Sequence, residues 1–123
     1  MTRRGRFAAA LAVAVSLTLA VAGCAPQAGS IPVDETTVVL DVRTPGEFAE
    51  GHLDGAVNLD VQAADFDARA AELDPDADYV VYCRSGNRAG TAITRLTDLG
   101  FDSLVNAGSL SAASTATGLP VVD

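Results

Sequence analysis

The sequence of 123 residues contains few of the residue types that build metal, cofactor and nucleic-acid sites. It has no lysine, one histidine and two cysteines, and its eight arginines face sixteen acidic residues. One histidine and one free thiol at these spacings do not make a metal site, and the sequence has no glycine-rich motif for a nucleotide phosphate. A formal charge of −8 opposes binding to nucleic acid and to anionic lipid. We therefore expect no metal, no cofactor and no nucleic-acid partner.

The first 23 residues have the pattern of an export signal. Three arginines within the first six residues precede an uncharged apolar run from Phe7 to Ala22. Such a run is short for a membrane-spanning helix and typical of a signal-peptide core. It leads into Val-Ala-Gly-Cys (residues 21–24), which resembles a bacterial lipobox, where cleavage precedes a cysteine that then carries lipid. The alternative is an uncleaved signal anchor over the same run.

This pattern predicts a lipoprotein signal peptide over residues 1–23, a lipidated Cys24 with a linker over residues 24–33, and a folded domain over residues 34–123. Removal of the signal would leave five arginines against sixteen acids, a formal charge of −11. Membrane attachment would then depend on the acyl chains of Cys24. We expect an exported monomer, held by lipid at the bacterial cell membrane or envelope, with its domain on the extracytoplasmic side.

The two cysteines carry further information. Small exported domains usually pair their cysteines in disulfides. If Cys24 carries lipid, Cys83 has no partner and stays a free thiol in an oxidising compartment. An unpaired thiol is a liability there unless it is used, so this argument favours a functional Cys83.

Cys83 lies where a strand is expected to end and a helix to begin. An apolar, β-prone run (Tyr79–Tyr82) stops at Cys83, and apolar residues with helical spacing follow the loop from Ala89 to Leu99. A helix N-terminus gathers free N–H groups, and Arg84 and Arg88 add positive charge. Such a setting lowers the pKa of a cysteine from about 8.5 to roughly 3.5–7.5. The sequence thus predicts a nucleophile in an anion cradle; the alternative is an inert core cysteine.

The remaining pattern alternates strands and helices. Expected strands span residues 37–42, 56–59, 79–82 and 101–105, and expected helices span residues 45–50, 62–73, 87–99 and about 109–118. Loops or turns are expected at residues 51–55, 74–78 and 106–108. This alternation without a repeat indicates an α/β fold, a mainly parallel sheet with helices on both faces.

Several motifs in this order resemble the rhodanese family, most closely its short, exported, single-domain members. The motifs are Leu-Asp-Val-Arg (40–43), Glu-Phe (47–48), Gly-His-Leu-Asp-Gly-Ala-Val-Asn (51–58) and Cys-Arg-Ser-Gly-Asn-Arg (83–88). The resemblance implies a small three-layer rhodanese-like domain and a sulfurtransferase of the thiosulfate type. Cys83 would accept a sulfane sulfur as a persulfide and pass it to cyanide or a thiol. Some rhodanese-like domains are instead binding or regulatory modules, so a membrane-tethered, non-catalytic module is the alternative.

The resemblance also assigns roles to residues around the thiol. Arg84, Ser85, Gly86, Asn87 and Arg88 would bind the anionic sulfur donor, largely through backbone N–H groups, and Gly86 would adopt a backbone angle that a Cβ forbids. Asp41 and Arg43 would tie the end of their strand to neighbouring loops. His52 would fix its loop rather than act as a base.

Two other uses of the thiol fit less well. Cysteine phosphatases of a related fold place five residues between cysteine and arginine, whereas four separate Cys83 from Arg88. A phosphatase also needs an acid for its leaving group, and no residue near the loop is an evident candidate in the sequence. Redox exchange would need a resolving thiol close by, and Cys24 is distant.

Overall fold

The computed structural model describes residues 30–123, so the expected signal peptide over residues 1–23 and the lipidated Cys24 lie outside the described residues. Its main sheet has the strand order β3-β1-β4-β5, and every neighbouring pair in it is parallel. The four strands are β1 (Val38–Asp41), β3 (Val57–Asn58), β4 (Tyr79–Cys83) and β5 (Leu104–Ser109). Parallel neighbours place the carboxyl ends of these strands at one edge of the sheet.

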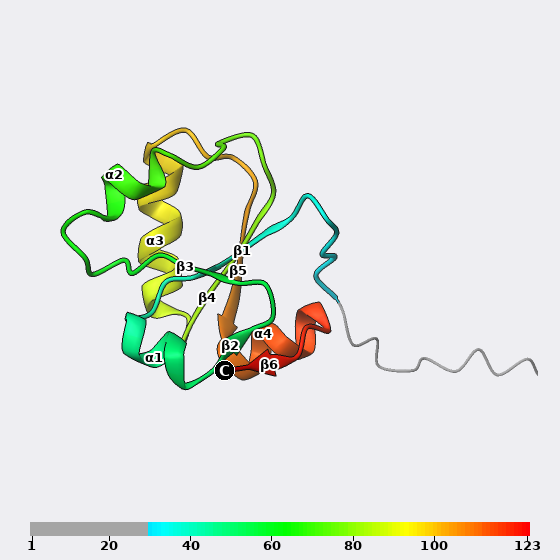
Figure 1. Cartoon of the computed structure of the whole chain (residues 1–123). Coiled ribbons are helices and arrows are strands. Elements are labelled where there is room, and N and C mark those ends of the chain that lie inside the picture. Colours follow the sequence, from blue (N-terminus) through cyan, green and yellow to red (C-terminus); the bar gives the residue numbers. More distant parts are fainter. Residues whose placement is uncertain (1–29) are drawn as a thin grey trace, which may run out of the picture.

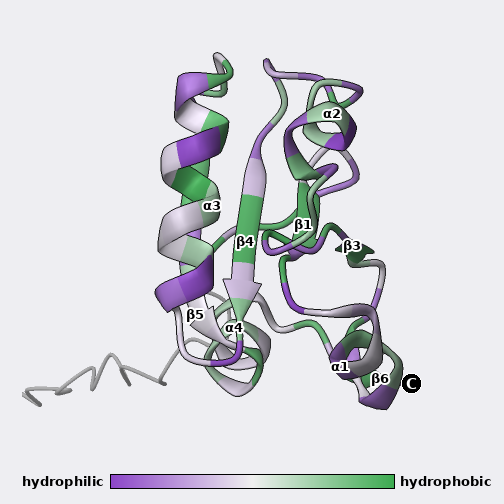
Figure 2. Ribbon diagram, turned by 90° about the vertical axis from the view of Figure 1, so that its left-hand side faces the viewer, coloured by the Kyte–Doolittle hydropathy of each residue, from purple (hydrophilic) through white to green (hydrophobic). Residues whose placement is uncertain are grey.

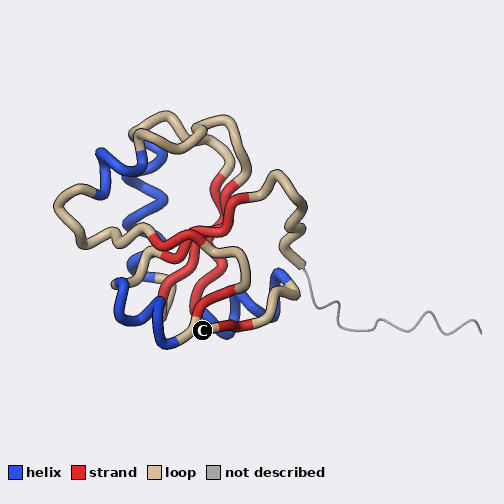
Figure 3. Tube along the Cα trace, in the orientation of Figure 1, coloured by secondary structure: helices blue, strands red, loops and turns tan. Residues whose placement is uncertain are grey.

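Helices cover both faces of the sheet, as the sequence predicted. Helices α2 (Phe66–Ala70) and α3 (Asn87–Asp98) pack on one face, α4 (Leu110–Thr117) packs on the other, and α1 (Pro45–Glu50) lies near the carboxyl edge (Figure 1). Figure 3 shows the strands gathered in the middle of the molecule with the helices around them. The expected three-layer α/β fold is confirmed.

Strand β4 explains why the core has two halves. All five of its residues are buried, which is typical of an interior parallel strand covered on both faces. Tyr79, Val81 and Cys83 face the cluster beneath α2 and α3, whereas Val80 and Tyr82 face the cluster beneath α4. Cys83 is therefore a core residue, and it lies at the carboxyl end of β4, where the core meets the loop.

Three expectations about local structure are wrong. Residues 51–55 are not only loop, because β2 (His52–Leu53) pairs antiparallel with β6 (Val121–Val122), and no strand was expected at either place. Residues 106–108 are not a turn but part of β5, where the register skips one residue opposite Val81 and Tyr82. Helix α2 is shorter than the expected 62–73, since turns replace its first residues.

The segment before β1 also contacts the domain. Ile31 and Val33, which were expected in the linker, pack against the cluster beneath α4. The backbone N–H of Ile31 donates to the carbonyl of Ala116 at 2.9 Å. Contacts with the core thus begin before the expected domain start at residue 34. Over residues 30–123 the structure contains no helix of the length and apolarity that crossing a membrane requires.

Candidate active site

Cys83 is the last residue of β4, and its side chain is fully buried beneath the loop that follows. The chain passes from Cys83 through Arg84 and Ser85 to Gly86, and α3 begins at Asn87. Figure 2 shows β4 pointing to the edge of the molecule where the start of α3 and α4 lie, with α1 further along the same edge. Gly86 has φ = 94°, the left-handed conformation expected of it, and it turns the chain back into α3.

The loop directs its backbone N–H groups at the sulfur. The N–H of Gly86 donates to Sγ of Cys83 at 2.9 Å. Burial by itself raises the pKa of the Cys83 thiol, but hydrogen bonds from the backbone N–H groups of Ala89, Ser85, Gly86 and Arg88 outweigh it and lower the pKa below the ordinary value. The loop therefore stabilises the thiolate, which is the nucleophilic form of cysteine.

The side chain of Asn106 in β5 holds the loop through hydrogen bonds. The Nδ2 group of Asn106 donates to the carbonyl of Gly86 at 3.1 Å, and its Oδ1 accepts from the N–H of Gly108 at 2.9 Å. A Cβ at position 86 would lie 3.4 Å from the Cα of Gly108. This role could not be expected from the sequence, where Asn106 has the surroundings of a turn residue. The bulge in β5 is what brings Asn106 and Gly108 under the loop.

Arg88, at the start of α3, pairs with Glu47 of α1. Its Nη1 lies 2.9 Å from Oε2 of Glu47, and its Nη2 donates to Oε1 at 3.2 Å. The hydrogen bond from Arg88 is the main reason that the pKa of Glu47 is lowered. Glu47 is thus an acidic residue close to the loop, which the sequence alone did not indicate. Because Glu47 is an ionised partner of Arg88, however, it is not available as a proton donor.

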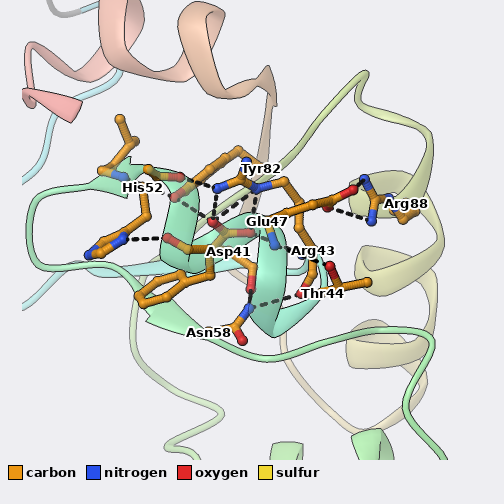
Figure 4. A network of polar contacts seen from close by, with 11 residues as sticks. Asp41, Arg43, Thr44, Glu47, His52, Asn58, Tyr82 and Arg88 are labelled. Atoms are coloured by element: carbon orange, nitrogen blue, oxygen red, sulfur yellow. Dashed lines mark hydrogen bonds and ion pairs between the residues drawn. The ribbon is translucent and has the colours of Figure 1, made fainter. Parts of the chain in front are cut away.

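Asp41 and Arg43 form a buried ion pair at the end of β1 (Figure 4). The guanidinium of Arg43 contacts both carboxylate oxygens of Asp41, with Nη2 to Oδ2 at 2.6 Å, and also donates to the carbonyl of Gly51 at 2.6 Å. Burial raises the pKa of Tyr82, so its hydroxyl stays protonated; it donates to Asp41 and accepts from the N–H of Leu53. This network links β1, β4 and β2.

His52 lies at the far side of this network from Arg88 in Figure 4. Its ring stacks on Phe48 with a centroid distance of 3.7 Å, and its Nδ1 is 2.8 Å from the carbonyl oxygen of Phe48. Asn58 donates from Nδ2 to the carbonyls of Asp41 and Arg43, which holds β3 to the end of β1. These contacts join loops and strand ends, and none of them involves Cys83.

A cleft of about 400 Å³ lies beside the loop. It is lined by residues that follow β1 and by residues of α1, the loop, the start of α4 and β6, namely Arg43, Glu47, Glu50, Arg84, Ser109, Leu110, Ser111 and Val121. Arg84 is exposed and faces the cleft, whereas the buried Cys83 is not part of its lining. Ser85 and Asn87 are exposed on the loop. Between residues 30 and 123, no three histidine, cysteine or acidic side chains gather to hold a metal ion.

The fold and the loop together define an α/β domain that presents a stabilised thiolate at the carboxyl end of an interior parallel strand. The chain belongs to the rhodanese-like domain family, because the model of that family, described as "Rhodanese-like domain", matches residues 28–116. This finding agrees with the resemblance seen in the sequence motifs.

Similar proteins and structures support the same assignment. The chain is 34% identical to a sulfurtransferase of Allochromatium vinosum, over 72% of this chain and 80% of that protein. It is 31% identical to the thiosulfate sulfurtransferase PspE of Escherichia coli, over 66% of this chain and 78% of that protein. Among solved structures, a rhodanese with anions from E. coli aligns with a TM-score of 0.59 and 28% identity, covering 71% of this chain and 98% of that one.

Proposed function

We propose that the protein is a sulfurtransferase that carries a sulfane sulfur as a persulfide on Cys83. The observation that supports this most directly is the set of backbone N–H groups around Sγ, which lowers the pKa of the thiol despite its burial. The same groups suit the outer sulfur of a persulfide, which is also anionic. Relatives that are 31–42% identical are named thiosulfate sulfurtransferases.

The reaction has two displacement steps. With thiosulfate as donor, the Cys83 thiolate attacks the outer sulfur, the bond to the sulfonate sulfur breaks, and sulfite leaves with the electron pair. In the second step an acceptor, either cyanide or a thiolate, attacks the outer sulfur of the persulfide. The bond to Sγ breaks, its electron pair returns to Cys83, and thiocyanate or a new persulfide leaves.

Residues of the loop and its surroundings have separate tasks in this proposal. The N–H groups of residues 85, 86, 88 and 89 hold the anionic sulfur, and Arg84 attracts the anionic donor from the cleft. Arg88 braces the loop, since its guanidinium is held by Glu47. Because Cys83 has no exposed surface, the loop or its neighbours must move for the donor to reach Sγ.

The decisive experiment measures the intact mass of the domain (residues 30–123) after incubation with thiosulfate and again after cyanide. These residues contain every described strand and helix and both core clusters, with Cys83 as their single cysteine. We expect a gain of one sulfur mass that cyanide removes as thiocyanate, and no gain in Cys83→Ser. A folded domain that alkylates at Cys83 but gains no sulfur would overturn the thiosulfate reaction. It would favour the alternative, a tethered binding or regulatory module.

We also propose that residues 1–23 direct export and that Cys24 carries lipid. The support is the order of basic start, apolar run and lipobox-like residues 21–24 in the sequence. Cells that express the full chain with labelled palmitate should incorporate the label into the wild type and not into Cys24→Ser. The wild-type protein should also fractionate with membranes. Equal labelling of both proteins would refute lipidation at Cys24.

A further inference from the structure

The cleft beside the loop is larger than a simple sulfur donor or cyanide requires. Its volume of about 400 Å³ falls in the range of about 300–1,000 Å³ that is typical of sites for organic ligands. Two of its lining residues are apolar, Leu110 from α4 and Val121 from β6. The cleft can therefore hold an organic molecule with a carbon chain beside the reactive loop.

Two charged side chains in the cleft are free to meet a ligand. Of the four charged residues that line it, Arg43 is paired with Asp41, and Glu47 is paired with Arg88. Within residues 30–123, Glu50 and Arg84 make neither an ion pair nor a side-chain hydrogen bond. The other four arginines of this range all bind a carboxylate or a carbonyl. The cleft thus offers one free carboxylate and one free guanidinium.

The start of α4 adds to the positive side of the cleft. Ser109 caps this helix by accepting from the N–H of Ala112, and Leu110 and Ser111 form its first turn. All three of these first residues line the cleft. Free N–H groups at a helix start favour an anionic group, so a carboxylate in the cleft would meet both Arg84 and this helix end. Glu50, the last residue of α1, favours a cation instead.

We propose that the cleft binds a zwitterionic amino-acid thiol, which is the sulfur acceptor. Its α-carboxylate binds Arg84 and the start of α4, its ammonium group binds Glu50, and its carbon chain contacts Leu110 and Val121. This inference rests on the proposed sulfurtransferase function and names the acceptor class of the same site. A thiol that carries only one of the two charges satisfies half of the site and leaves the other charge of the cleft without a partner.

The transfer itself balances without an added reductant. The acceptor loses its proton to solvent, and its thiolate attacks the outer sulfur of the Cys83 persulfide. A sulfur–sulfur bond forms to the acceptor while the bond between the outer sulfur and Sγ breaks. The electron pair of the broken bond stays on Sγ, so Cys83 returns as a thiolate and the product is the amino-acid persulfide.

A test that does not depend on sulfur transfer uses three methanethiosulfonate reagents on the domain (residues 30–123). They carry an aminoethyl, a sulfonatoethyl or a methyl tail, so they probe the approach to Cys83 with a cation, an anion and a neutral group. Dividing each charged rate by the methyl rate removes any effect of a variant on the thiol itself. The variants are Glu50→Gln and Arg84→Gln, and Glu72→Gln is the control because Glu72 is exposed near α2 and does not line the cleft.

We expect Glu50→Gln to lower the aminoethyl-to-methyl ratio about three- to fivefold, the effect of one unit charge about 4 Å away with screening close to that of bulk water. Arg84→Gln should lower the sulfonatoethyl-to-methyl ratio by a similar factor, and Glu72→Gln should change neither ratio. Both effects should shrink as salt is raised, because exposed charges are screened within about 10 Å at 0.1 M. If Glu50→Gln leaves the aminoethyl ratio unchanged, or if Cys83 reacts with none of the reagents, the proposal is overturned.

Acceptor kinetics then separate this proposal from the general function. With thiosulfate as donor, kcat/KM should be higher for cysteine than for cysteamine, which lacks the carboxylate, and for 3-mercaptopropionate, which lacks the ammonium group. Glu50→Gln should lower the value for cysteine and cysteamine but not for 3-mercaptopropionate. If thiocyanate forms from cyanide while the three thiols react equally, the sulfurtransferase stands and the zwitterion site is refuted. If no persulfide forms on Cys83, the proposed function itself fails, and with it the transfer to the acceptor.

Discussion

Replacing Gly86 by alanine should damage both the fold and the thiol, and the structure gives the size of the effect. Gly86 has φ = 94°, a left-handed conformation that costs a residue with a Cβ about 1–2 kcal/mol. The added Cβ would also touch the Cα of Gly108 at 3.4 Å, at the close end of ordinary van der Waals contact. Against this, a Gly→Ala change gains about 0.4–1 kcal/mol by restricting the unfolded chain. We expect Gly86→Ala to lower the free energy of unfolding by about 1 kcal/mol.

Gly90→Ala is the matched control for this experiment. Gly90 lies inside α3, in a helical conformation, and a Cβ there would meet only Nδ2 of Asn106 at 3.9 Å, an ordinary contact. Alanine is favoured over glycine in helices by about 0.8–1.0 kcal/mol, mainly because it restricts the unfolded chain more than glycine does. Gly90→Ala should therefore stabilise the domain, and the two variants should differ by about 2 kcal/mol.

Urea unfolding and thiol titration provide the two readouts. A change of 1 kcal/mol shifts the urea midpoint by about 0.5–1 M for a domain of this size. The pH dependence of alkylation by iodoacetamide gives the pKa of Cys83, which should rise in Gly86→Ala because the N–H at 2.9 Å from Sγ is displaced. Unchanged stability would refute the strain argument. Lower stability with an unchanged thiol pKa would show that this N–H does not hold the thiolate.

Four further substitutions test the ion pairs, the Tyr82 hydroxyl and the thiol. Glu47→Gln should lower the free energy of unfolding by about 1 kcal/mol at neutral pH. Because the pKa of Glu47 is lowered in the folded domain, this carboxylate stabilises the wild type above its pKa, and that stability is lost as pH falls through the pKa. The variant should lack this part of the pH dependence, which urea unfolding at pH 3–7 measures. Asp41→Asn should cost about 3–5 kcal/mol because it leaves Arg43 buried and unpaired, and Tyr82→Phe about 1–3 kcal/mol, both measured by urea unfolding. The lowered pKa of Cys83 stabilises the fold above that pKa, so unfolding free energy should rise with pH up to about 8.5, and Cys83→Ser should lack this rise.

The elements that the sequence predicted best are those whose residues carry a long, regular pattern. Strand β4 is a continuous apolar run, and α3 repeats its buried residues at helical spacing over three turns, so both were found with nearly correct bounds. Strands β2 and β6 have two residues each and exist only because distant segments pair. No periodicity can be read from two residues, so pairing of this kind was out of reach.

Two supporting residues were missed because each already had a local explanation. Glu47 occupies the third helical position after Thr44, whose Oγ1 accepts from its N–H, so the sequence explained it as part of a helix start. Its side chain is instead used 41 residues away by Arg88. Asn106 belongs to the segment 106–108, which has the composition of a turn. In the structure this segment belongs to β5, because a bulge accommodates one extra residue and the strand continues. At both positions a local role already explained the residue type, so the sequence did not indicate a partner elsewhere in the fold.

The position of α1 links the reactive loop to the cleft. This helix has six residues, too few to be stable alone, so contacts made by its ends and flanks must hold it in place. Glu47 binds Arg88 at the start of α3, and Glu50, three residues later, lines the cleft; residues at this spacing lie on the same face of a helix. A displacement of Arg88 would therefore also act on α1, the helix that carries Glu50. We therefore expect Glu47→Gln, which removes the ion pair between α1 and Arg88, to raise the acceptor KM as well as to lower the stability of the domain.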